Sequence, residues 1–76
     1  MKNIDDNIIK ALTIIFPKTK IPKKINNLKM GDIKGWDSLA HFHLILQIEK
    51  IFNYRFSSSV FPKLVTIKNI KKNLFK

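Results

Sequence analysis

A run of helix breakers in the first half of the chain sets the strongest limit on its fold. Pro17, Pro22, Gly31 and Gly35 lie between two segments whose apolar residues recur at helical spacing. We therefore predict two helices joined by a connection of about 20 residues, which is unusual in a compact domain unless its own side chains pack. Residues 23–28 could form a helical turn within it. Five apolar residues can anchor the connection between its lysines: Ile21, Ile25, Leu28, Met30 and Ile33.

The two flanking helices are predicted from their apolar spacing. The first ends near Phe16 and has acidic residues in its first turn, at Asp5 and Asp6. The second runs from about Ser38 to Phe52, and its polar residues form a narrow strip of His43, Gln47 and Lys50. Its apolar surface is wider than burial requires, so we expect part of it near Ser38 to remain exposed. That surface comprises Leu39, Phe42, Ile45, Leu46, Ile48 and Phe52.

Two shorter helices are predicted in the last part of the chain. Ser59 can cap the first of them and place Pro62 in its first turn, where a missing amide costs little. Thr66 is a favoured cap for the second, which carries apolar residues at Ile67, Ile70 and Leu74. We therefore predict an all-α fold with one domain over residues 1–76. It is a small four-helix bundle, with three main helices, one short helix and a long loop between the first two.

Composition narrows the class of protein. The chain has 76 residues and no cysteine, which excludes disulfides and thiolate metal sites and fits a reducing compartment. No apolar run is long enough to span a bilayer and no leader pattern is present, so we expect a cytoplasmic monomer. His41 and His43 lie two residues apart on a helix and would point to different faces. We expect partly solvated surface there, rather than a metal site or a catalytic histidine.

The segment Gly35-Trp36-Asp37-Ser38-Leu39 stands where the polar connection gives way to the longest predicted helix. Asp37 is a favoured N-cap residue, so its carboxylate can accept hydrogen bonds from backbone amides two or three residues on. Ser38 would then occupy the first helical position, with its hydroxyl in solvent beside amides that lack helical partners. A phosphate ester on Ser38 would lie in the favourable field of the helix N-terminus.

This segment and the residues after it resemble the acyl carrier protein family. In that family an Asp-Ser-Leu triplet opens the second helix, and its serine, matched here by Ser38, carries 4'-phosphopantetheine. The resemblance implies a non-enzymatic carrier that holds an acyl group as a thioester on this arm and presents it to partner enzymes. It also implies a phosphopantetheinyl transferase as a partner. The same register continues without a gap through Ile48, Glu49, Phe52, Phe56, Leu64, Thr66 and Ile67.

The resemblance assigns further roles around Ser38. Asp37 would help the transferase to recognise its target in addition to capping the helix. Leu39 and Glu49 match positions at which the transferase or the partner enzymes dock. Trp36 is expected to pack in the core or the loop, because its large apolar body stabilises by burial and its indole N–H needs one partner. Contact of Trp36 with the arm or its cargo is the alternative.

Charge is where the chain departs from this family, whose familiar members are acidic. It has 15 basic and 5 acidic residues and a formal net charge of +10. His43 and Lys50 replace expected acids, so we expect acyl-loading and acyl-transferring partners with neutral or acidic docking surfaces. Biased composition, rich in Lys, Ile, Asn and Phe, explains the charge equally well. The Trp-Asp-Ser-Leu form and the Ile-Glu-x-x-Phe continuation are more similar to discrete carriers of specialised pathways, such as surface-polysaccharide or natural-product assembly, than to the main fatty-acid carrier. The Gly-Gly of peptidyl carriers is missing.

Two other functions are compatible with the composition. A small basic helical protein could hold nucleic acid through phosphate contacts, but the lysines are spread along the chain and the aromatic residues fall mostly on predicted core faces. Basic amphipathic helices could also contact acidic lipid. The carrier prediction requires neither nucleic acid nor a membrane.

Overall fold

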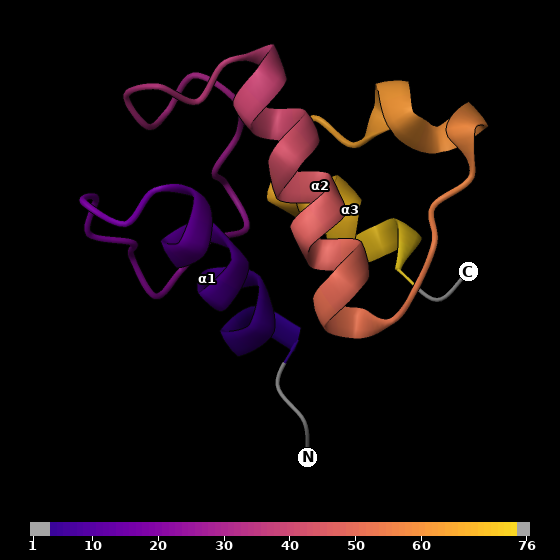
Figure 1. Cartoon of the computed structure of the whole chain (residues 1–76), viewed down its shortest axis with the longest axis horizontal. Helices are drawn as coiled ribbons and strands as arrows, with labels where there is room; N and C mark the ends of the chain where they lie inside the picture. Colours follow the sequence, from indigo (N-terminus) through magenta and orange to yellow (C-terminus); the bar gives the residue numbers. More distant parts are fainter. Residues whose placement is uncertain (1–3, 75–76) are drawn as a thin grey trace.

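The computed structural model describes residues 4–74 as an all-helical chain folded around one core (Figure 1). Its elements, in order, are α1 (Ile4–Ile15), α2 (Ser38–Phe52), the 3-10 helix η1 (Ser58–Lys63) and α3 (Ile67–Asn73). The predicted all-α class, with three main helices and one short one, is confirmed. No helix within residues 4–74 combines the length and apolar character needed to cross a membrane.

Helix α2 has the predicted bounds because local chemistry fixes both of its ends. The Asp37 carboxylate accepts a hydrogen bond from Ala40 N at 2.9 Å, and this confirms the predicted cap. At the other end, Asn53 adopts the left-handed conformation with φ of 52°, and its N–H bonds the carbonyl oxygens of Glu49 and Lys50. Asn tolerates this conformation better than most residues, so it ends the helix cleanly.

The last two helices confirm one predicted cap and correct the other. Thr66 Oγ1 accepts from Asn69 N at 3.1 Å and begins α3 as expected. The prediction for η1 was wrong, because Ser59 lies inside that helix, which begins after Ser57, and Pro62 lies near its end. The Ser57 and Ser59 hydroxyls bond each other at 3.0 Å, and the N-cap residue Ser57 makes no side-chain cap bond to any described residue.

The long loop between α1 and α2 packs by its own side chains, as predicted. Ile25 and Ile33 are buried in the core, and the other three apolar anchors are partly buried against it. Residues 23–28 do not form the helical turn that was expected; instead Leu28 N donates to Ile25 O across a tight turn. The loop is then tied to the start of α3, because Ile67 N donates to Leu28 O at 3.0 Å.

The core lies between α1, α2, α3 and the loop. Each of α1, α2 and α3 contributes residues of one face, whereas η1 has no buried residue. The side chains with the least exposure and the largest volume are Ile8, Leu12, Ile25, Leu44, Ile48, Leu64, Ile67 and Ile70. This arrangement leaves the opposite side of α2, including the beginning of the helix, in contact with solvent.

Candidate functional site

Ser38 is the first residue of α2 and its side chain is exposed. Helix α2 begins where the long loop joins it, at one end of the molecule (Figure 1). The first helical hydrogen bond runs from His41 N to Asp37 O at 2.8 Å, and the Asp37 carboxylate takes the amide of Ala40. The amides of Ser38 and Leu39 precede these bonds. The hydroxyl therefore stands in solvent at a capped helix N-terminus, where negative charge is favoured.

Trp36 anchors in the core the segment of the loop that leads into α2. Its ring is 2% exposed and packs 5.6 Å from the Phe16 ring at the end of α1. Its indole Nε1 donates to His41 Nδ1 at 2.9 Å. The prediction that Trp36 packs in the core is thus confirmed, and the residue two before Ser38 cannot shift without breaking buried contacts.

His41 has a role that differs from the one expected. It is half-buried, in keeping with the expected partly solvated surface, but it also makes two bonds that were not predicted: its Nδ1 accepts from Trp36 and its Nε2 bonds the Leu64 carbonyl oxygen. Since Nδ1 accepts, Nε2 carries the proton and donates to Leu64. His41 thereby links the loop before α2 to the segment between η1 and α3. His43 is exposed, as expected.

An exposed apolar stripe extends along α2 from the Ser38 end. Leu39, Phe42 and Leu46 are 66%, 46% and 42% exposed. Their spacings of three and four residues place them on one helix face. Phe42 also packs edge-on against Phe61, with ring centroids 6.4 Å apart, which joins η1 to the border of the stripe. The expected exposure near Ser38 is confirmed, and it extends for about two turns.

Glu49 lies about three helical turns beyond Ser38, or about 16 Å at a rise of 1.5 Å per residue. Its carboxylate Oε2 accepts from Phe56 N at 2.8 Å, and its carbonyl oxygen accepts from Tyr54 N. Glu49 therefore holds the segment that leaves α2. This structural role is sufficient to explain why an acidic residue stands at position 49, whether or not a partner enzyme docks there.

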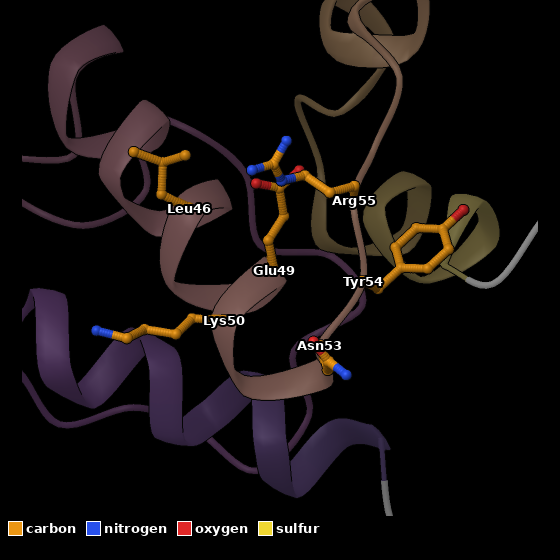
Figure 2. Close-up of a pocket in the computed structure, with 6 residues that line it drawn as sticks. All are labelled: Leu46, Glu49, Lys50, Asn53, Tyr54 and Arg55. Atoms are coloured by element: carbon orange, nitrogen blue, oxygen red, sulfur yellow. The ribbon is translucent and has the colours of Figure 1, made fainter.

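A pocket of about 380 Å³ lies at the C-terminal end of α2 rather than beside Ser38. Figure 2 shows the Glu49 and Arg55 side chains pointing toward one another, whereas the Lys50 side chain points away from them. Nothing in the sequence signalled this hollow, because it forms only when the chain turns back at Asn53. The structure does not bring Ser38 into it. The pocket is lined by Leu46, Glu49, Lys50, Asn53, Tyr54 and Arg55.

Comparison of the chain with family descriptions, curated proteins and solved structures finds no match in any of the three. The class of protein is therefore argued from the residues themselves and from where the fold puts them.

Proposed function

We propose that the chain is an acyl carrier protein whose Ser38 bears a 4'-phosphopantetheine arm. One observation carries the proposal: an exposed serine is the first residue of a long helix, capped by the preceding aspartate and held in place by the buried Trp36. The resemblance in sequence supports the same serine. Under this proposal the protein performs no chemistry on its cargo but supplies a tether, a folded body and a docking surface.

The residues around Ser38 fit a phosphate diester. The hydroxyl is exposed, so a transferase can reach it, and the amides that begin α2 favour negative charge at this point. In the modification, a bond forms between Ser38 Oγ and phosphorus while the phosphoanhydride of coenzyme A breaks. The nucleotide half leaves, and the hydroxyl proton passes to base on the transferase or to solvent. When bound, the arm supplies a terminal thiol that holds an acyl group as a thioester.

Tethering is the physical advantage of such a carrier. A cargo held on an arm stays at high effective concentration near each enzyme that docks on the carrier. Asp37 serves as a cap and, we propose, as a contact for the transferase. Leu39 begins the exposed stripe next to the attachment point, so it is the apolar residue that a docking enzyme would cover first.

The basic surface indicates which partners fit. The formal net charge is +10, and Lys50 and His43 are exposed on the helix that carries the stripe. A partner with a basic docking surface would be repelled, whereas a neutral or acidic one would associate faster. We propose dedicated loading and transferring enzymes of the latter kind, in a specialised pathway within the cytoplasm.

The nucleic-acid alternative finds less support in the structure. Base stacking needs exposed aromatic faces beside basic side chains. Trp36, Phe16 and Phe56 are buried in the core instead. A long single-stranded oligonucleotide that bound tightly at physiological salt, with Phe42 as its stacking residue, would favour the alternative.

A thiol titration tests the carrier function directly. The chain has no cysteine, so the bare protein reads zero. Incubation with coenzyme A and a broad-range phosphopantetheinyl transferase should create one thiol per chain, with the mass increase located on Ser38. Ser38→Ala should read zero, whereas Ser58→Ala, which changes the exposed first residue of η1, should be labelled normally. If several such transferases leave Ser38 bare, the proposal is wrong.

A further inference from the structure

A second hollow, of about 430 Å³, lies between α1, the long loop and α3. Its walls come from segments far apart in the sequence, and none of its residues belongs to the Ser38 surface or the stripe. Lysines supply three of its side chains, and two asparagines provide amide groups. The lining consists of Asp5, Lys23, Lys24, Ile25, Asn26, Asn27 and Lys68.

Three residues of this hollow, Asp5, Ile25 and Asn26, are held in place by contacts with the rest of the fold. Lys71 Nζ binds Asp5 Oδ1 at 2.6 Å and Asn26 Oδ1 at 2.6 Å, so it joins α1, the loop and α3 at one point. Ile25 is 1% exposed and anchors the loop in the core. The tight turn from Ile25 to Leu28 then holds the asparagines. The backbone that carries the lysines is therefore anchored on both sides of the hollow, so binding a ligand need not order it.

The charges of the hollow suit an anion. Lys71 offsets the carboxylate of Asp5 through their ion pair, so the positive charges of Lys23, Lys24 and Lys68 dominate the lining. Three like charges line one hollow, so an anion that enters it is attracted by all three. Because Asn26 Oδ1 accepts from Lys71, the NH2 end of the same amide is left to donate.

We propose that this hollow binds an oligophosphate. Lysine ammonium groups bind phosphate as point charges, and amide N–H groups add directional donors. The volume is within the range of small-molecule sites. The sole strongly apolar side chain in the described lining is Ile25, which is committed to the core, so a lipid tail would find little to contact. The oligophosphate can be inorganic or part of a nucleotide.

Two matched triple variants test the site. Lys23→Gln, Lys24→Gln and Lys68→Gln together remove the three lysines of the hollow. Lys10→Gln, Lys34→Gln and Lys63→Gln remove the same charge from exposed positions outside it. Binding of tripolyphosphate is measured by titration calorimetry at low salt. The first triple should raise Kd at least about tenfold, because the loss of even one charge-assisted hydrogen bond has an effect of that size. The second triple should raise Kd at most about threefold. Equal weakening by both triples would show nonspecific attraction and overturn the proposal.

Thermal melting gives a readout that separates binding from folding. Tripolyphosphate should raise the Tm of the unchanged protein and of the second triple, but not that of the first. Without ligand, both triples should keep a Tm close to that of the unchanged protein, because all six lysines are exposed. Equal stabilisation of the two triples by tripolyphosphate would contradict the proposal.

Further arms identify the ligand class. Citrate carries similar charge on carboxylates, and binding as tight as that of tripolyphosphate would overturn an oligophosphate site. ATP that binds more tightly than tripolyphosphate would assign the site to nucleotides, and equal affinities would assign it to the phosphates alone. Ser38→Ala should bind tripolyphosphate unchanged, so this site and the carrier function succeed or fail separately.

Discussion

Helices α2 and η1 both begin with an exposed serine two residues after a buried aromatic residue, Trp36 or Phe56, yet of the two only α2 has a side-chain cap. At α2 the preceding Asp37 caps Ala40 N, and Trp36 is buried one residue earlier. At η1 the Ser57 hydroxyl bonds Ser59 instead of a backbone amide. Helix α2 has 15 residues and η1 has six. A serine at a helix start is common. The Asp37 cap, the buried Trp36 and the length of α2 together make Ser38 a candidate for modification, and Ser58 is its control.

Removing the buried Trp36 side chain should have the largest effect on stability. Trp36→Ala should lower the free energy of unfolding by about 3–5 kcal/mol, the usual range for emptying a buried aromatic site. The half-buried Phe61 lies within η1, and Phe61→Ala should cost clearly less. Urea unfolding followed by circular dichroism measures both. Equal losses would mean that the fold depends on Phe61 as much as on Trp36.

His41 should rank next, because it joins the Trp36 indole to the Leu64 carbonyl oxygen. His41→Leu leaves both groups without their partner and should cost about 1–3 kcal/mol. His43→Leu changes an exposed neighbour and should remain within about 0.5 kcal/mol of the unchanged protein. The same unfolding measurement applies. A neutral His41→Leu would show that water replaces the bridge readily.

The Asp37 cap of α2 should contribute less to the free energy of unfolding than the two hydrogen bonds of His41. Asp37→Ala should cost about 1 kcal/mol, whereas Ser57→Ala at η1 should cost almost nothing because its hydroxyl caps no amide among the described residues. Asp37→Asn keeps a capping oxygen but removes the charge. If Asp37 also contacts the transferase, Asp37→Asn should retain its stability and still be modified more slowly. Loss of modification only in proportion to helix content would leave Asp37 as a cap alone.

These differences also show what the sequence could and could not predict. The bounds of α2 and the caps at Asp37 and Thr66 were predictable because a cap bonds amides a few residues away. At η1 three consecutive serines compete for the same role, so local chemistry did not choose between them. The role of His41 depends on Leu64, 23 residues away, and on the packing of Trp36. The lysine hollow likewise depends on α3 meeting the loop, which no local pattern encodes.

The smallest effect on stability should come from the stripe. Leu39 is 66% exposed, so Leu39→Ser should change the free energy of unfolding by no more than about 0.5 kcal/mol. If the stripe is the docking surface, the same variant should still be labelled on Ser38 by a sufficient amount of transferase but pass its acyl group to a partner enzyme more slowly. Val65→Ser is the matched control, because Val65 is also exposed and lies outside α2. Equal transfer rates for the two variants would mean that the stripe does not bind the partner enzyme, so the docking surface beside Ser38 would have to lie elsewhere.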